Sequence, residues 1–254
     1  MSPRAQQMHM RPLQWMVDEA IEFIRTHEPE GGYLLADSFG KDSTVILELS
    51  RMAGVKFLHI HNRTGIEPPE LIKFGHRTRP NVIDIAPRTT LWQGIKKWGA
   101  PTINQRWCCP EMKERHVAGH PRNVLVGIRA EESFKRKQRP RISQTATHPK
   151  KLFKPIFHWL EWHVWEFIEG MNLPYCELYD EGFSRLGCVV CPMICSSGMG
   201  QVKRNRERWP GFYRTFEHAV TWWFWNVTWW DRVKWRQPER FLGAWYRAFH
   251  DGSK

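Results

Sequence analysis

Four cysteines stand in two short motifs that could bind a metal ion or a cluster. Cys108 and Cys109 are adjacent, and Cys188 and Cys191 form a C-x-x-C motif. A C-x-x-C motif brings two thiolates to one site, and thiolates favour zinc or an iron–sulfur cluster. Adjacent cysteine side chains must diverge, which suits a cubane cluster better than one zinc ion. The pattern therefore favours a cluster, with zinc or ordinary buried or redox-active thiols as alternatives.

Two further cysteines, Cys176 and Cys195, lie outside these motifs. A lone cysteine is most often a small buried hydrophobic side chain, and this is the first expectation for both. Cys195 follows closely after the C-x-x-C motif, so it is the better candidate for a thiol that carries sulfur.

A short loop with a single glycine could bind phosphate. Backbone N–H groups at the start of a helix attract anions, and a glycine lets a ligand approach the backbone. Serine hydroxyls add hydrogen bonds, the lysine adds charge, and the aspartate can cap the helix or hold Mg²⁺. The alternative is an ordinary strand-to-helix turn with a serine cap. The spacing is not that of a Walker loop. The loop consists of Ser38, Phe39, Gly40, Lys41, Asp42 and Ser43.

Hydrophobic patterns place this loop in an α/β domain. Helical spacing of apolar residues precedes and follows it, and short buried runs predict strands on either side. Strands that alternate with helices are typical of a mainly parallel, twisted sheet flanked by helices. The predicted helices cover 13–24, 44–52 and 89–98, and the predicted strands cover 33–36, 56–60, 81–85 and 123–126.

The pattern changes beyond Pro155. A helix is predicted over 159–170, an irregular cysteine-bearing segment over 172–200, and an aromatic helical region over 208–250. We therefore expect an α/β domain over 1–155, with the cysteine-bearing segment and a Trp-rich helical appendage over 156–254 packed on it.

The charge of the chain points to an anionic partner. Lys and Arg number 38 against 26 Asp and Glu among 254 residues, a formal charge of +12. Two basic tracts, over 135–141 and 203–208, are either solvated surfaces or contacts to phosphates, and the first is predicted to be an exposed loop. Binding of nucleic acid by such residues falls steeply with salt. Composition thus favours a nucleotide and a nucleic acid as partners.

The location of the protein is predicted from absent signals. The N-terminus lacks the apolar run and cleavage site of a signal peptide. The longest apolar stretch, over 219–230, is interrupted by polar residues and is shorter than the roughly 20 residues of a membrane span. We expect a cytoplasmic protein without membrane contact, in which cysteines bind metal more often than they form disulfides.

Residues 221–230 include five tryptophans and are apolar nearly all round a helix. Such a helix is mainly core, although part of it could contact a protein partner or stack on bases.

Several motifs in order resemble one family. The loop over 38–43 resembles the pyrophosphate-binding loop of the N-type ATP pyrophosphatases, and its S-F-G form is closest to the phosphoadenosine phosphosulfate (PAPS) reductase family. Residues 61–70 are similar to the family's N-T-G-x-x-F-P-E segment, and 127–133 to its G-x-R-x-x-E-S segment. Residues 155–175 are similar to P-[IL]-x-x-W…D-V-W…L-P-Y, with His163 in place of the aspartate.

The resemblance spans roughly residues 31–195 and implies an adenine nucleotide α-hydrolase-like fold that binds ATP with Mg²⁺. It adds Thr64, Gly65, Gly127 and Arg129 to the residues expected to bind nucleotide. It also implies a 4Fe–4S cluster on all four paired cysteines, as in the iron–sulfur branch of the family.

The family's sulfonucleotide reductases carry a nucleophilic cysteine in a C-terminal E-C-G-[IL]-H motif, but no cysteine follows Cys195 here. Members with a cluster and no such cysteine include proteins that put sulfur into the DNA backbone and proteins that thiolate tRNA. We therefore expect an ATP pyrophosphatase that adenylates an oxygen and supports DNA phosphorothioation, with a cysteine desulfurase as sulfur donor. Its expected catalytic residues are Lys41, Asp42, Arg129 and Cys195. The alternatives are an APS/PAPS reductase with a different nucleophile and a non-catalytic nucleotide or iron–sulfur scaffold.

Overall fold

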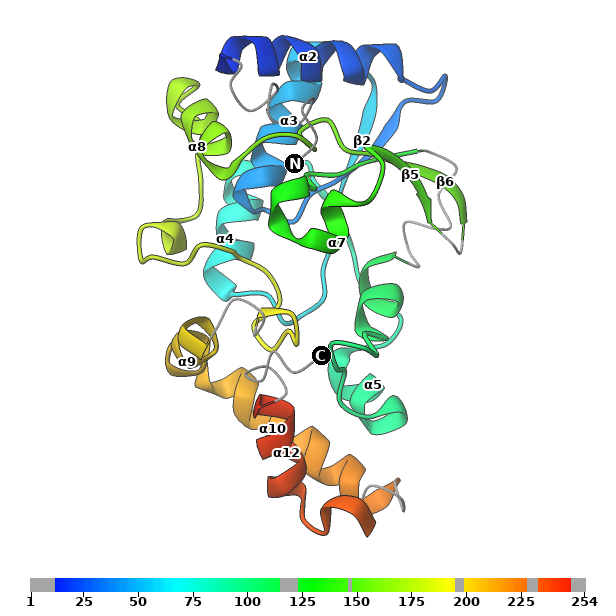
Figure 1. Cartoon of the computed structure of the whole chain (residues 1–254), viewed down its shortest axis with the longest axis vertical. Coiled ribbons are helices and arrows are strands. Elements are labelled where there is room, and N and C mark those ends of the chain that lie inside the picture. The colour runs from blue at the N-terminus through cyan, green and yellow to red at the C-terminus, as the bar shows by residue number, and fades with distance from the viewer. Residues whose placement is uncertain (1–11, 115–122, 146–147, 195–198, 228–232, 248–254) are drawn as a thin grey trace. The chain divides into compact units, whose positions relative to one another are not determined.

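The computed structural model describes residues 12–114, 123–145, 148–194, 199–227 and 233–247 (Figure 1). The elements in chain order are α2 (Leu13–Thr26), β1 (Tyr33–Ala36), α3 (Lys41–Ala53), β2 (Phe57–Asn62), α4 (Pro69–Thr78), β3 (Ile83–Ile85), α5 (Leu91–Trp98), the π-helical turn η1 (Pro110–Glu114), β4 (Val124–Leu125), the 3₁₀ turn η2 (Ala130–Glu132), α7 (Phe134–Lys137), β5 (Ile142–Thr145), β6 (His148–Phe153), α8 (Glu161–Gly170), the 3₁₀ turn η3 (Glu177–Tyr179), α9 (Met199–Arg208), α10 (Pro210–Asn226) and α12 (Pro238–Arg247).

The chain divides into two compact units, and each is described by itself. The first unit, here called the sheet unit, comprises Met1–Asn62, Glu70–Ile85 and His116–Arg185. The second, the helical unit, comprises Arg63–Pro69, Ala86–Arg115 and Leu186–Lys254. The chain therefore passes from one unit to the other several times. The predicted boundary at residue 155 divides the chain at one position, whereas each unit combines several segments, so this boundary stays a prediction.

The sheet unit is built on six strands in the order β3-β2-β1-β4-β6-β5. All neighbours pair in parallel except β5, which is antiparallel to β6. Leu34 of β1 is opposite Leu58 of β2 on one side and Val124 of β4 on the other, so β1 is a central strand. The predicted α/β class with a mainly parallel sheet is confirmed.

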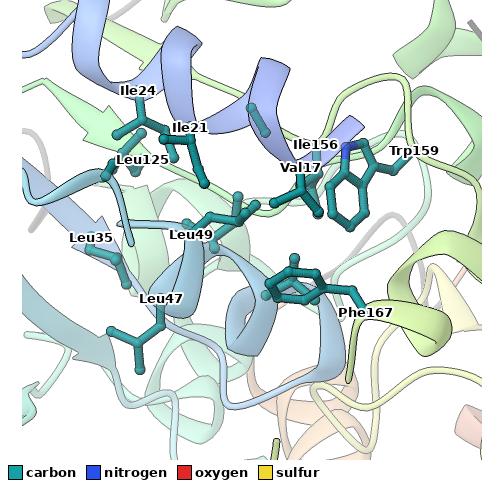
Figure 2. Packing of buried hydrophobic residues seen from close by; sticks show 14 of the residues in the cluster. Val17, Ile21, Ile24, Leu35, Leu47, Leu49, Leu125, Ile156, Trp159 and Phe167 are labelled. Carbon is teal, nitrogen blue, oxygen red and sulfur yellow. The ribbon is translucent and has the colours of Figure 1, made fainter. Parts of the chain in front are cut away.

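One face of the sheet carries the main hydrophobic core, which Figure 2 shows. Helix α2 contributes a buried stripe with the spacing that the sequence predicts, from Met16 to Ile24. Buried residues of α3 and α8 pack with it, and Trp159 is fully enclosed. Since side chains of a strand alternate between faces, Leu35 joins this core while Leu34 packs with Ile60 and Val124 in a separate, smaller cluster.

Local capping signals fix the ends of several helices. Thr90 begins α5 with a capping box in which Gln93 is the reciprocal partner. Gly54 ends α3 at a φ of 69°, a conformation that glycine adopts at little cost. His163, the third residue of α8, supports the start of that helix, because its Nδ1 accepts a hydrogen bond from the N–H of Leu160 at 2.8 Å. Its buried ring thus caps a helix, a role an aspartate at this position could also fill.

The helical unit packs α5 and α12 against the aromatic helix α10. Trp223 is buried, and it lies where a Cβ atom on Gly99 would approach its ring to 2.7 Å. The indole N–H of Trp245 donates to the carbonyl of Pro101 at 2.8 Å. The expectation of an aromatic helical region is confirmed, but Trp222 and Trp225 are 39% and 49% exposed, so α10 is not core all round.

The basic tract over 135–141 departs from the expected exposed loop. Its first residues belong to α7, because Ser133 accepts from the N–H of Arg136 and caps a helical turn, and the loop prediction is wrong there. Arg141, its last residue, forms an ion pair with Glu19, and its guanidinium lies 3.8 Å from the ring centre of Phe23. Part of the tract therefore holds α2 in place. Among the described residues, no helix is long and apolar enough to cross a bilayer.

Candidate functional site

The loop between β1 and α3 has an unusual backbone turn at Phe39. Its φ is 62°, a left-handed value that a bulky residue adopts only when its surroundings enforce it. The carboxylate of Asp37 accepts the N–H of Phe39 at 2.6 Å, and the Phe39 ring stacks on His61 with centroids 4.0 Å apart. A Cβ atom on Gly75 would lie 2.2 Å from the same ring. The turn is therefore held from three directions.

The start of α3 presents backbone donors, as a phosphate loop requires. Gly40 is the N-cap residue and makes no side-chain cap. The N–H of Lys41 donates to the hydroxyl oxygen of Tyr179 at 3.0 Å, and the hydroxyl of Ser43 lies 3.2 Å from that of Ser38. A Cβ atom on Gly40 would come within 3.2 Å of the Tyr179 oxygen. The phenol oxygen thus accepts a hydrogen bond as an anionic oxygen would at the same N–H.

Lys41 is buried, and its side chain points to the segment that contains α8 and η3. Its ammonium group donates to the carbonyl of Ser184 at 2.7 Å and lies 3.2 Å from the carboxylate of Glu161. The ring centre of Tyr179 lies 5.1 Å from the same nitrogen. Burial raises the pKa of Tyr179, so the phenol stays protonated. Lys41 must exchange partners before it can contact a phosphate.

Asp42, Arg129 and Gly127 come together although they lie far apart in the sequence. The Nε of Arg129 is 2.6 Å from Oδ1 of Asp42, and its Nη1 is 2.5 Å from Glu131. A Cβ atom on Gly127 would lie 2.8 Å from the carbonyl carbon of Asp42, so only glycine allows this approach. Burial raises the pKa of Asp42, against the opposing charges of Arg129 and Lys41. Three of the predicted site residues thus form one cluster.

Sequence reasoning missed a buried charge network beneath the loop. Oδ2 of Asp37 lies 2.8 Å from both Nε of Arg79 and Nε2 of His59. Arg79 also donates to Thr44 at 2.6 Å. Burial alone would raise the pKa of Asp37, but His59 and Arg79 lower it. No spacing signal links these residues, because Asp37 follows β1, His59 lies in β2 and Arg79 follows α4.

The paired cysteines all belong to the helical unit. The hydroxyl of Thr64 lies 3.6 Å from the sulfur of Cys188, and the N–H of Val189 donates to Ile66 at 2.7 Å. The segment over 63–69 therefore supports the C-x-x-C motif. Thr64 and Gly65 were expected to bind nucleotide, and their N–H groups donate to the carboxylate of Glu67 at 2.9 Å. Their role in nucleotide binding stays a prediction.

The thiols influence one another electrostatically. The hydrogen bond from Cys108 lowers the pKa of Cys109 to about 6, with help from Lys113 and Arg106, so that Cys109 is the more acidic of the pair. The pKa of Cys108 is raised by Cys109 and burial, and further by Cys188 and Cys191. The charge of Cys188 foremost raises the pKa of Lys113, a residue that sequence reasoning missed.

The number, type and arrangement of the paired cysteines can be compared with the ligands that a 4Fe–4S cluster requires. Four soft donors lie within electrostatic reach of one another, and in the described part of the chain no cysteine forms a disulfide. Donor type and number therefore fit a 4Fe–4S cluster. The same described residues contain no three His, Cys, Asp or Glu side chains already arranged as metal ligands, so the ligand geometry is not preformed.

The two remaining cysteines, Cys176 and Cys195, lie outside the paired motifs. Cys176 is fully buried and lies in the sheet unit, as expected of a small hydrophobic side chain. Cys195, the expected sulfur carrier, lies outside the described residues.

Comparison with known proteins agrees with the motifs. The family model for the phosphoadenosine phosphosulfate reductase domain matches residues 32–194. An adenosine 5'-phosphosulfate reductase of Bacillus cereus is 30% identical over 74% of this chain and 83% of its own length. The uncharacterized protein MJ0066 of Methanocaldococcus jannaschii is 33% identical over 79% of this chain, which spans only 44% of that relative.

The fold agrees as well. The crystal structure of phosphoadenylyl-sulfate (PAPS) reductase from Candida auris, a phosphate complex, aligns with a TM-score of 0.53 at 19% sequence identity. The alignment covers 69% of this chain and 93% of that one. With its family domain matched over most of the sheet unit and the cysteine motifs, the chain belongs to the phosphoadenosine phosphosulfate reductase family.

Proposed function

We propose that the protein is an ATP pyrophosphatase that activates an oxygen of DNA by adenylation and supports its replacement by sulfur. The observation that supports the proposal is the cluster at the start of α3, where the N–H of Lys41 and the Asp42–Arg129 ion pair belong to the first turn of the helix and its neighbours. Such a set provides donors for phosphate oxygens, a carboxylate for Mg²⁺ and a guanidinium for developing negative charge.

The first step is transfer of the adenylyl group. A non-bridging phosphate oxygen of DNA attacks the α-phosphorus of ATP, and the bond to pyrophosphate breaks. Asp42 would hold Mg²⁺, and Arg129 would turn from Asp42 to the phosphate on which charge accumulates. The N–H of Lys41 turns from the Tyr179 oxygen to the leaving pyrophosphate. The residues expected to contact nucleotide are Ser38, Phe39, Gly40, Lys41, Asp42, Ser43, Thr64, Gly65, Gly127 and Arg129.

The second step is displacement of AMP by sulfur. A cysteine desulfurase supplies sulfur as a persulfide, and a thiol reductant provides the two electrons that convert it to thiophosphate sulfur. Cys195 is the proposed carrier of the persulfide. A 4Fe–4S cluster held by Cys108, Cys109, Cys188 and Cys191 would supply redox or sulfur-binding chemistry when bound.

DNA is the proposed acceptor because of the charge of the chain. The formal charge is +12, although several basic side chains already form internal ion pairs, among them Arg141 with Glu19 and Arg206 with Glu217. The remaining excess favours a polyanion over a small anionic substrate. A tRNA acceptor carries the same charge, so the assay below includes it.

The second candidate function is sulfonucleotide reduction. It is favoured by the Bacillus cereus relative, which is named an adenosine 5'-phosphosulfate reductase and matches this chain over most of its length. In that case the same nucleotide loop binds the adenylyl group of APS or PAPS, and a thiol such as Cys195 attacks the sulfur while the S–O bond to the nucleotide breaks. A thiol reductant such as thioredoxin then releases sulfite from the S-sulfo intermediate.

The test is a reconstituted reaction. Protein purified without oxygen is incubated with ATP, Mg²⁺, cysteine, a cysteine desulfurase, dithiothreitol and either DNA or tRNA. We expect pyrophosphate in amounts that depend on DNA, and phosphorothioate linkages in the nuclease digest by mass spectrometry. If thiolated nucleosides form from tRNA and no product forms from DNA, the acceptor is tRNA and not DNA. The absence of both products would contradict the proposal.

A further inference from the structure

The segment around the Cys108–Cys109 pair contains a pocket that the proposed chemistry does not use. It is a shallow depression, open to solvent, with a volume of about 550 Å³, and it is lined by Trp98, Gln105, Trp107 and Glu111. That volume lies within the range of small-molecule sites. All four lining residues belong to the helical unit.

One wall of the pocket is fixed and the other is accessible. The indole N–H of Trp107 donates to the carbonyl of Gly99 at 3.0 Å, and a Cβ atom on Gly94 would lie 2.1 Å from its ring. Trp107 is thus seated directly on α5. Trp98 lies with its ring centre 5.1 Å from that of Trp107, at an angle of 51°, and is 40% exposed. The two indoles present aromatic surface to whatever enters.

Lysines accompany the aromatic rings. The ammonium of Lys97 lies 4.7 Å from the ring centre of Trp98, and that of Lys96 lies 4.8 Å from the ring centre of Trp222. Both lysines are exposed, and a cation–π contact at an exposed site is weak. A phosphate can therefore draw Lys97 away and leave the ring face to a base.

The polar lining residues suit the edge of a particular kind of base. Gln105 carries an amide that donates and accepts, while the carboxylate of Glu111 accepts only. Cytosine presents an amino donor beside a ring-nitrogen acceptor, which matches this pair. Thymine presents a carbonyl where cytosine has the amino group, and that carbonyl would face the Glu111 carboxylate.

We propose that this pocket binds a nucleobase, with preference for cytosine over thymine, from a single-stranded or locally opened DNA. Stacking on Trp98 and Trp107 supplies the binding energy, and Lys97 contacts the adjoining phosphate. The inference deepens the proposed function by naming how its DNA substrate is held. It is measured by binding alone, so it can fail while adenylation is observed, and it can hold where no turnover occurs.

The experiment is fluorescence anisotropy with labelled oligodeoxycytidylate and oligodeoxythymidylate of about a dozen nucleotides, a length within the usual site size of single-strand binders. Trp98→Leu should weaken binding of the cytidylate on the order of tenfold, the loss of roughly one stacked base. Trp98→Phe should weaken it less. Trp225→Leu removes a similarly exposed tryptophan that does not line the pocket, and should change binding less than twofold.

Several results would contradict the proposed nucleobase pocket. Unchanged binding by Trp98→Leu, or an equal loss in Trp225→Leu, would overturn the pocket. If an abasic oligonucleotide binds as tightly as the cytidylate, binding depends on the phosphates alone, and the nucleobase pocket is overturned too. Glu111→Ala should abolish the preference for cytidylate over thymidylate, and equal binding of both by the wild-type protein would overturn the base assignment. Circular dichroism confirms that each variant is folded.

Discussion

The Nε of Arg129 lies 2.6 Å from Oδ1 of Asp42, which joins the turn after β4 to the first turn of α3 by a largely buried ion pair. If Asp42 binds Mg²⁺ and Arg129 binds phosphate, the ion pair between them must break when ATP binds. The pair then keeps both groups in position while no nucleotide is present, and its two charges are released together when Mg–ATP binds.

Arg129→Gln should reduce pyrophosphate release on the order of a hundredfold or more, the usual cost of losing one donor that stabilises transition-state charge. Arg136→Gln is the matched control, because Arg136 is an arginine of the same segment that pairs with Glu132 and lies nearer the surface. It should retain activity within a few fold. Steady-state kinetics of both variants provide the measurement. Equal activity in Arg129→Gln and the wild type would exclude Arg129 from catalysis.

Arg79→Met should destabilise the sheet unit by about 3–5 kcal/mol, because it leaves the buried carboxylate of Asp37 without its guanidinium. The control is Arg51→Met, which removes an exposed ion pair with Glu48 and should cost less than about 1 kcal/mol. Urea unfolding monitored by circular dichroism gives both free energies. A cost for Arg79→Met no larger than that of the control would show that the Asp37–Arg79 pair contributes little.

Lys154 should make stability rise with pH above about 8. Burial, with the charge of Arg139, lowers the pKa of this lysine from 10.5 to about 8. Between these values the unfolded chain holds a proton that the folded protein has lost, so the free energy of unfolding increases with pH. Below pH 8 both states are protonated and the slope disappears.

Lys154→Met should remove this rise, and the difference between the two proteins isolates it from the other lysines. The comparison is made by urea unfolding at several pH values from 7 to 10. Parallel curves for the variant and the wild type would contradict the lowered pKa. Lys154 also donates to Pro140 and Ser143, so only the slope, not the absolute stability, tests the argument.

Protein purified without oxygen should contain about four iron atoms and four acid-labile sulfides per chain. Replacement of Cys109, Cys188 or Cys191 by serine should remove most of both. Cys176→Ser is the control and should retain them, because this thiol is buried in the sheet unit, whereas the four paired cysteines belong to the helical unit. Cys195→Ser should keep the cluster spectrum and lose the thiolated product. Stoichiometric zinc without iron would contradict the cluster.

Much of the sheet unit could be predicted from local patterns. The stripe from Met16 to Ile24 predicted α2, and the strand–loop–helix pattern around Gly40 predicted the turn between β1 and α3. Such features depend on residues close in sequence, so spacing and turn chemistry suffice. The gathering of Gly127 and Arg129 with Asp42 followed from family motifs rather than from spacing.

The partners of these residues could not be predicted in the same way. Tyr179 accepts from Lys41 across 138 positions, and Arg79, which follows α4, reaches Asp37, which follows β1. Lys113 near the thiols is one of many lysines in the sequence. Arg141 appeared in a basic tract, yet it holds α2 through Glu19. Long-range packing decides which charged side chains are structural, and composition does not reveal it.

A paired assay distinguishes activation of ATP for adenylyl transfer to DNA from sulfonucleotide reduction. Wild-type protein purified without oxygen, and its Arg129→Gln variant, are given ATP with DNA in one reaction and APS or PAPS with thioredoxin in the other. We expect DNA-dependent pyrophosphate from ATP, lost in the variant, and no sulfite. Sulfite without pyrophosphate would contradict it and identify a sulfonucleotide reductase.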